Sequence, residues 1–127
     1  MPSGKMKASF RRSEDMPAGN VTGIKAGGFL WLSAIRGSGD SVKDQARTAL
    51  EDLKQILASQ GSILGDVIKA TIYLQNIADR ADFHQVWMEY FGTENPPARI
   101  VLEVSNASLR PGGDSRFAFD VVALAPD

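Results

Sequence analysis

The chain has 127 residues, 43% of them hydrophobic and 23% charged, which predicts one domain over residues 1–127 with a core of its own. Basic and acidic residues nearly balance at 14 against 15, so no overall charge favours nucleic acid or an anionic membrane. With no cysteine, the sequence excludes disulfides, a thiolate nucleophile and a cysteine zinc site. No apolar stretch has the length of a secretory signal core or a membrane span, so we expect a cytoplasmic protein.

The first third of the chain predicts an N-terminal arm followed by a hairpin. Residues 1–19 are polar and basic, which indicates a flexible or edge arm. Residues 21–25 and 29–34 are apolar runs separated by Gly27 and Gly28, a pattern typical of two antiparallel strands joined by a tight turn.

A long amphipathic helix is predicted next. Ser41 and Asp44 have the spacing of a capping box, in which the serine accepts a hydrogen bond from a free amide of the first turn. Apolar residues then recur at steps of three and four as far as Gly61. They form one stripe: Val42, Ala46, Ala49, Leu50, Leu53, Ile56 and Leu57. We therefore expect this helix to bury one side against a sheet.

The second half repeats the order helix then strand. Residues 67–74 are rich in β-branched side chains and predict a strand parallel to an earlier one, reached by a right-handed crossover. Asp79 can cap a second helix that Gly92 ends. Strands over 100–104 and 116–124 follow, with residues 105–114 as a long exposed loop between them.

The resulting order, ββαβαββ, predicts an α+β fold in which a mixed sheet carries two helices on one face. The strands are apolar on both sides, so the second face also needs a cover. We expect a closed oligomer of identical subunits to supply it.

Arg99 is the leading candidate for a binding residue. It follows Pro96, Pro97 and Ala98, and the two prolines fix the path by which the chain enters the next strand. A planar guanidinium on a rigid mount at the mouth of a strand suits recognition of a carboxylate. The alternative is a structural ion pair, with Glu103 or with a carboxylate across a subunit boundary.

Several segments together resemble the RidA (YjgF-type) reactive intermediate deaminase family. They are Phe29-Leu30-Trp31-Leu32-Ser33, Val67-Ile68-Lys69-Ala70-Thr71-Ile72-Tyr73-Leu74, Glu89-Tyr90-Phe91-Gly92, Pro96-Pro97-Ala98-Arg99 and Leu102-Glu103-Val104. The resemblance covers residues 21–124 and implies a chorismate-mutase-like homotrimer with clefts between its subunits. It also implies hydrolysis of enamines or imines, such as 2-aminoacrylate, to a keto acid and ammonia without a cofactor or a metal.

The resemblance assigns roles to particular residues. Arg99 matches the arginine that binds the substrate carboxylate, Ser33 matches a serine that lines the cleft, and Val101 stands where a backbone group addresses the substrate nitrogen. Asn20 stands in place of a frequent tyrosine, and His84 in place of an asparagine.

The water-activating glutamate of the family is the main departure. The preferred register puts Ala118 at its position, while Asp120 lies two residues on and on the same face of the strand. Asp120 is then either a general base or a solvated carboxylate. His84, the one histidine, is either a ligand contact or proton donor or a residue of the helix surface, and it has no partners for a metal site.

The sequence thus favours an enamine/imine deaminase-like hydrolase that acts on a small carboxylate through Arg99 and Asp120. A non-catalytic trimer that binds small carboxylates is an alternative, favoured by Ala118. A pathway-specific deaminase or hydrolase for a larger ring-opened acid is another, favoured by Asn20 and His84. Cleavage of RNA comes last, because the basic start of the chain is short and has few aromatic residues.

Overall fold

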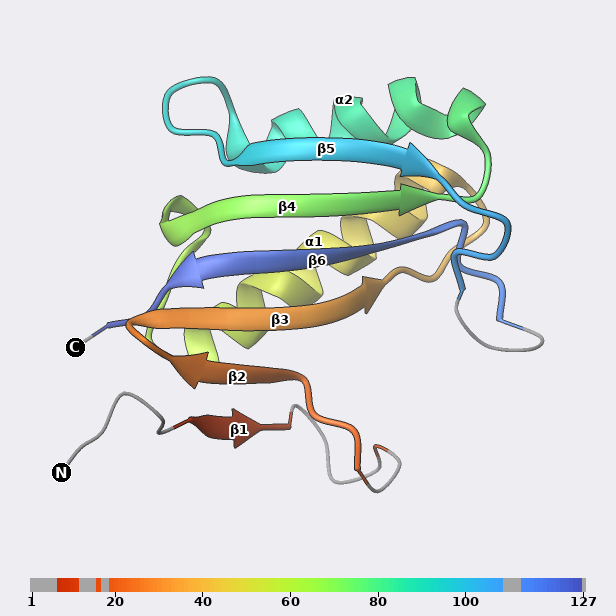
Figure 1. The fold of residues 1–127 in the computed structure, drawn as a ribbon. Helices are drawn as coiled ribbons and strands as arrows, with labels where there is room; N and C mark the ends of the chain where they lie inside the picture. Colours follow the sequence, from red (N-terminus) through yellow and green to blue (C-terminus); the bar gives the residue numbers. More distant parts are fainter. Residues whose placement is uncertain (1–6, 12–15, 17–18, 109–112, 127) are drawn as a thin grey trace, which may run out of the picture.

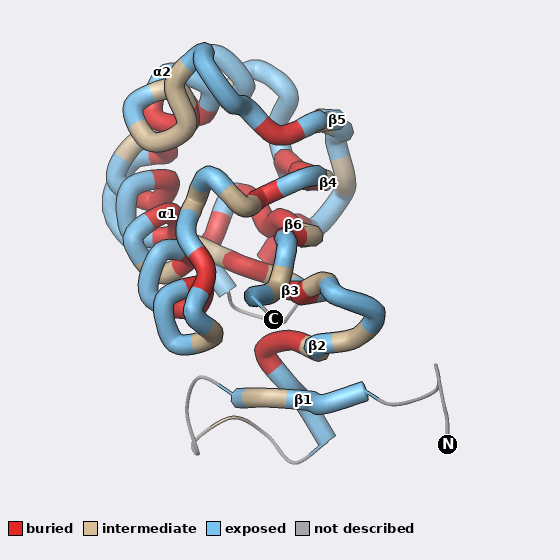
Figure 2. The backbone as a smooth tube through the Cα atoms, turned by 90° about the vertical axis from the view of Figure 1, so that its left-hand side faces the viewer, coloured by how far each residue is buried: buried red, intermediate tan, exposed pale blue. Residues whose placement is uncertain are grey.

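The computed structural model describes residues 7–11, 16, 19–108 and 113–126, which form one sheet and two longer helices (Figure 1). The strands are β1 (Ala8–Phe10), β2 (Gly23–Ala26), β3 (Phe29–Arg36), β4 (Val67–Leu74), β5 (Ala98–Glu103) and β6 (Phe117–Leu124). The helices are α1 (Val42–Ser59) and α2 (Arg80–Phe91), and the short 3-10 turns are η1 (Leu64–Asp66) and η2 (Ile77–Asp79). The α+β fold and the two helices on one face are confirmed (Figure 2).

The strand order in the sheet is β1-β2-β3-β6-β4-β5. β6 is antiparallel to both β3 and β4, so those two strands run in the same direction although β6 separates them. β4 and β5 are parallel neighbours joined through α2. β1 adds an edge strand to the predicted order, so part of the N-terminal arm is an edge rather than a free segment.

The core lies between the sheet and the two helices. Alternate residues of β6, namely Phe117, Phe119 and Val121, are buried in it, and the predicted stripe of α1 is buried as a whole. The helix begins as expected, because the Ser41 hydroxyl accepts a hydrogen bond from the Asp44 amide at 3.0 Å. Every second residue of β6 faces the helices, and the apolar stripe of α1 faces the sheet. These two periodicities place the apolar side chains in one layer between sheet and helix.

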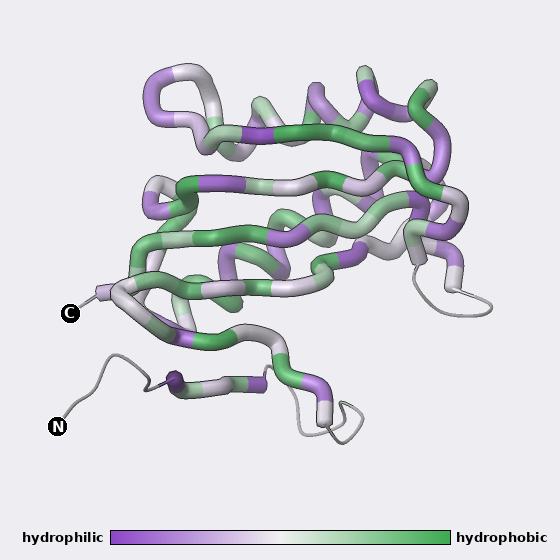
Figure 3. The backbone as a smooth tube through the Cα atoms, in the orientation of Figure 1, coloured by the Kyte–Doolittle hydropathy of each residue, from purple (hydrophilic) through white to green (hydrophobic). Residues whose placement is uncertain are grey.

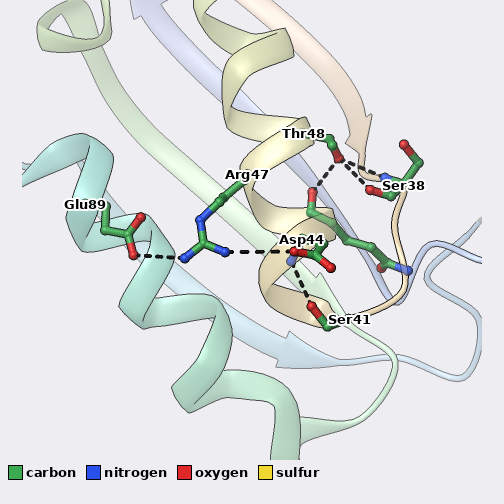
Figure 4. Close-up of polar contacts among 7 residues, drawn as sticks. Ser38, Ser41, Asp44, Arg47, Thr48 and Glu89 are labelled. Atoms are coloured by element: carbon green, nitrogen blue, oxygen red, sulfur yellow. Dashed lines mark hydrogen bonds and ion pairs between the residues drawn. The ribbon is translucent and has the colours of Figure 1, made fainter.

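Polar side chains at one end of α1 tie it to its neighbours (Figure 4). Arg47 bonds Glu89 of α2 at 3.3 Å and lies 4.0 Å from Asp44. The Thr48 hydroxyl donates to the Ser38 carbonyl at 2.9 Å, which fixes the loop before the helix. These exposed contacts set the position of α2 relative to α1 rather than adding much stability.

The segment between β5 and β6 is less exposed than expected. Ala107 and Ser108 are buried, and the Gln75 side chain accepts a hydrogen bond from the Ala107 amide. The buried Gln45 side chain of α1 holds the other end, because it donates to the Asp114 carbonyl and accepts from the Arg116 amide. The expected exposed loop over 105–114 is therefore found at residues 105, 106, 113 and 114 but not at 107 and 108; residues 109–112 lie outside the described part.

The second helix starts and ends close to the predicted positions. Asp79 occupies the position before α2, but its side chain makes no capping hydrogen bond; Asn76 caps the preceding turn η2 instead. Gly92 ends the helix with φ +64°, a conformation that side chains disfavour, and its amide bonds the Met88 carbonyl.

The face of the sheet away from the helices carries apolar side chains besides the polar ones of β3, β4 and β6, and no helix of the described residues covers it. Strand register places six apolar side chains on this open face: Phe29, Trp31, Ile100, Leu102, Val122 and Leu124. Trp31 and Ile100 keep 48% and 49% of their surface exposed, and the hydropathy of β5 and β6 is visible in Figure 3. No helix among the described residues is long and apolar enough to cross a membrane.

Candidate functional site

Arg99 lies under α2 at the outer edge of the sheet. It is the second residue of β5, which is the last strand in the sheet order. Its Nη2 atom is 2.8 Å from Nδ1 of His84, and its guanidinium carbon is 5.4 Å from the centre of the Trp87 ring. His84 and Trp87 are three residues apart in α2 and so share the side that covers β5.

The contact between these two side chains fixes the state of the imidazole. A guanidinium has donors but no acceptor, so Nδ1 of His84 must accept the hydrogen bond and carry no proton. The ring is therefore neutral in this arrangement, with its proton on Nε2, which remains a donor.

The charge of Arg99 is not compensated by the part of the chain that the structure describes. Its Nη1 atom is buried and has no hydrogen-bond partner there. Burial, and then the positive charge of Arg80, lower the pKa of Arg99. The predicted alternative of a pair with Glu103 is not observed within the described chain, because that carboxylate accepts from the Ile77 amide at 2.8 Å. A partly buried cation with a buried, unpartnered donor is costly unless a ligand supplies an anion.

The backbone of Val101 points to the free edge of the sheet. The Val104 amide donates to the Leu74 carbonyl, so its backbone groups face β4. Because backbone groups alternate sides along a strand, those of Val101 and Arg99 face away from β4. Val101 therefore presents its N–H and C=O at the free edge of the sheet, in the same strand as Arg99.

Asp120 belongs to a second group of side chains, on the open face. The Ser33 hydroxyl donates to its Oδ1 at 2.9 Å, and the Tyr73 hydroxyl donates to its Oδ2 at 3.4 Å. Burial raises the pKa of Tyr73, and the charge of Asp120 and this hydrogen bond raise it further. Ala118 lies on the same face, is fully buried, and offers no polar group.

Within one chain the two groups do not meet. We call Arg99, His84 and Trp87 with the Val101 backbone the edge cluster, and Ser33, Tyr73 and Asp120 the face cluster. Asp120 aligns with Thr71 of β4, and Thr71 with Ile100 of β5, so two strand spacings, about 10 Å, separate Asp120 from the edge strand. The side chain of Arg99 is also on the helix-covered face, opposite that of Asp120.

The remaining predicted residue lies with neither cluster. Asn20 is exposed, three residues before β2, and therefore towards the other side of the sheet from β5. The sequence pointed to neither Tyr73 nor Trp87 as a site residue. The alternation of β4 predicts the face of the sheet on which Tyr73 lies. Only the pairing of β4 with β6 shows that Asp120 lies on the same face and within reach.

Comparison with known proteins agrees with the fold and its motifs. The family model described as Endoribonuclease L-PSP matches residues 20–123. A RutC family protein of Pyrococcus horikoshii is 39% identical over 108 residues, covering 76% of this chain and 82% of that protein. One from Saccharolobus solfataricus is 32% identical over 105 residues, covering 76% and 82%.

Solved structures show the same fold. A YjgF family member from Neisseria meningitidis superimposes with a TM-score of 0.84 at 24% identity, covering 98% of this chain and 99% of that one. Yeast Mmf1 also reaches 0.84 at 21% identity, covering 95% and 100%. By its match to the family model and to the RutC relatives, this chain belongs to the RidA (YjgF-type) family.

Proposed function

We propose that this protein is an enamine/imine deaminase-like hydrolase that converts a small carboxylate-bearing intermediate to a keto compound and ammonia. The observation that carries the proposal is Arg99, a partly buried cation with an unpartnered Nη1 and no carboxylate beside it in the described chain. A substrate carboxylate would supply the missing charge and accept from the fork of the guanidinium. Trp87 and His84 hold the guanidinium in place for it.

The reaction also needs a group that activates water, and Asp120 is the candidate. The edge cluster contains the Arg99 cation, the neutral His84 imidazole and the Val101 backbone groups, but it contains no carboxylate. The face cluster contains a carboxylate but no cation. We infer that the two clusters meet between copies of the chain in a homotrimer, as the family resemblance implies, and that the open apolar face is the surface which packs there.

The chemistry would then run in two stages. Protonation of the enamine carbon gives an iminium ion, which has the electrophilic carbon that water attacks. As the C–O bond forms, Asp120 takes a proton from the water. It returns this proton to the nitrogen as the C–N bond breaks, and the hydroxyl of the adduct loses its own proton to solvent as it becomes the keto group. The products are the keto acid and ammonia, with no net oxidation or reduction.

A relative supports this reaction class. A protein of Escherichia coli K12 named "Putative reactive intermediate deaminase TdcF" is 33% identical over 66 residues, covering 50% of this chain and 51% of that protein. RNA cleavage, suggested by the name of the family model, has less support from residues: Lys7 and Arg11 are exposed members of the basic start, while Lys5 and Arg12 lie outside the described residues.

The second candidate is a trimer that binds small carboxylates without turning them over, and Ala118 favours it because the family glutamate is missing there in the preferred register. A coupled assay separates the two. 2-Aminoacrylate is generated in place, and keto acid formation is followed with the wild type, Arg99→Ala and Asp120→Ala, with Arg47→Ala as a control on the α1–α2 surface.

A hydrolase gives acceleration that both site variants lose and the control keeps. If the wild type is inert yet binds keto acids through Arg99, the protein is a binding module. The proposal fails altogether if Arg99→Ala changes neither ligand affinity nor turnover.

A further inference from the structure

We propose that Tyr73 is a positioning residue which, together with Ser33, holds the Asp120 carboxylate in the orientation required of a base. Neither the sequence motifs nor the family resemblance assigns Tyr73 a role. The inference rests on the proposed function, because it concerns how Asp120 would act in that reaction. It is built from the strand register, two hydrogen bonds and the small side chain of Ala118.

The register explains how a tyrosine of β4 reaches this carboxylate. Tyr73 lies directly opposite Ala118, and Asp120 lies opposite Thr71, so Tyr73 and Asp120 are diagonal neighbours on one face. Diagonal neighbours are about 7–8 Å apart at their Cα atoms, a gap that an aromatic side chain can cross. The hydroxyl of Tyr73 does so and ends 3.4 Å from Oδ2.

Ala118 provides the space for this contact. It has no exposed surface although it lies on the open face, and it stands between Tyr73 of β4 and Arg36 of β3. A long side chain at position 118 would occupy the volume across which the tyrosine leans. Ala118, which stands in place of the family glutamate, therefore also allows the Tyr73 hydroxyl to reach Asp120.

The two hydroxyls bind different oxygens of the carboxylate. Ser33 donates to Oδ1 and Tyr73 to Oδ2, so the carboxylate is held at both ends and its plane is fixed. Each oxygen keeps a further acceptor site, which leaves room for a water molecule as a third donor. A tyrosine hydroxyl is protonated at neutral pH, and the upward shift in the pKa of Tyr73 is in the direction that keeps it a donor.

The Tyr73 contact is the longer of the two, beyond the optimum for an O–H···O bond. Contacts of catalytic groups are often long without substrate and shorten once it binds. A residue that merely stabilised the sheet would not change the ionisation of Asp120, whereas a hydroxyl that donates to the ionised carboxylate favours that form. This difference makes the role of Tyr73 measurable.

The test compares Tyr73→Phe with Tyr90→Phe. Both changes remove one phenol hydroxyl that binds a carboxylate and keep the ring; Tyr90 binds Glu51 at 2.7 Å, on the helices and in neither cluster. For Tyr73→Phe we expect kcat to fall about tenfold with KM within about twofold, and the acid limb of the pH profile to move to higher pH. Tyr90→Phe should leave all three unchanged.

A second variant and a measurement without turnover complete the experiment. Ala118→Val should displace the ring and reproduce the kinetic effect of Tyr73→Phe while keeping the hydroxyl. The carboxyl carbon signal of Asp120, followed by NMR as pH falls, should titrate at higher pH in Tyr73→Phe than in the wild type.

Each failure has its own signature. If kcat and the acid limb of Tyr73→Phe equal those of the wild type, Tyr73 does not position the base and the inference is overturned while the hydrolase stands. If the wild type has no turnover, the proposed function falls, and the NMR titration alone decides whether Tyr73 acts on Asp120; equal titrations would overturn that too.

Discussion

The edge cluster and the face cluster differ in how their charges are satisfied. In the edge cluster, Arg99 has one hydrogen bond, from Nη2 to His84, and a buried Nη1 without a partner in the described chain. In the face cluster, Asp120 accepts a hydrogen bond at each oxygen. The first has a positive charge that no carboxylate of the described chain balances, whereas in the second each carboxylate oxygen already has a hydroxyl donor. An unpartnered buried donor is what the proposed binding role of Arg99 requires, and a carboxylate held at both oxygens is what the proposed role of Asp120 requires.

The largest effect is expected when each cluster is disabled in a different copy of the chain. Under the proposed function, Arg99→Ala and Asp120→Ala should each reduce kcat/KM about a hundredfold, since each would remove a charged contact with substrate or water. When the two variants are co-expressed, a cleft that takes one cluster from each of two copies is intact in about a quarter of cases. Turnover of the mixed preparation should recover to about a quarter of the wild-type value. A mixture as inactive as either variant alone would mean that the two clusters do not combine between copies of the chain.

Charge on the open face should disrupt the homotrimer proposed to join the clusters. Ile100, on this face, is 49% exposed, and Ile100→Asp would bury a carboxylate at the expected contact between copies. Sedimentation velocity should show a folded, smaller species with at least tenfold lower turnover. Ile63→Asp is the matched control, because Ile63 is 68% exposed in the loop before η1. Equal assembly in both variants would mean that the open face is not the contact surface.

The two clusters should also respond oppositely in stability. Arg99→Met keeps an apolar stem against Trp87 and removes a buried donor without a partner, so we expect the free energy of unfolding to rise by about 1 kcal/mol. Ser33→Ala removes a satisfied hydrogen bond at 2.9 Å and should lower it by about 1 kcal/mol. Urea unfolding at one protomer concentration measures both, and a loss of stability in Arg99→Met would show that the arginine has a structural role.

The smallest effect is expected away from both clusters. Burial, and then its hydrogen bond to Glu51, raise the pKa of Tyr90 to about 12, against about 10 in an unfolded chain. Between these values the unfolded state loses the proton first, so stability should fall as pH rises from about 10 to about 12. Subtracting the unfolding profile of Tyr90→Phe from that of the wild type isolates this slope, and parallel profiles would contradict it.

Local features of the fold followed from the sequence. The Ser41 cap, the buried stripe of α1 and the end of α2 at Gly92 each depend on residues within a few positions of one another. The motif that ends in Arg99 likewise identified the family and made Arg99 the candidate for binding, since two prolines fix how the chain enters β5.

The division of the site into two clusters was decided only by tertiary structure. Period-two alternation states that Ala118 and Asp120 share a face, but not which strands lie beside them. The insertion of β6 between β3 and β4 joined Ser33 and Tyr73 to Asp120, and it also placed that carboxylate two strands from β5 and on the opposite face from Arg99. Pairing between strands far apart in the chain is set by how the whole sheet packs against α1 and α2, so no local pattern could have specified it.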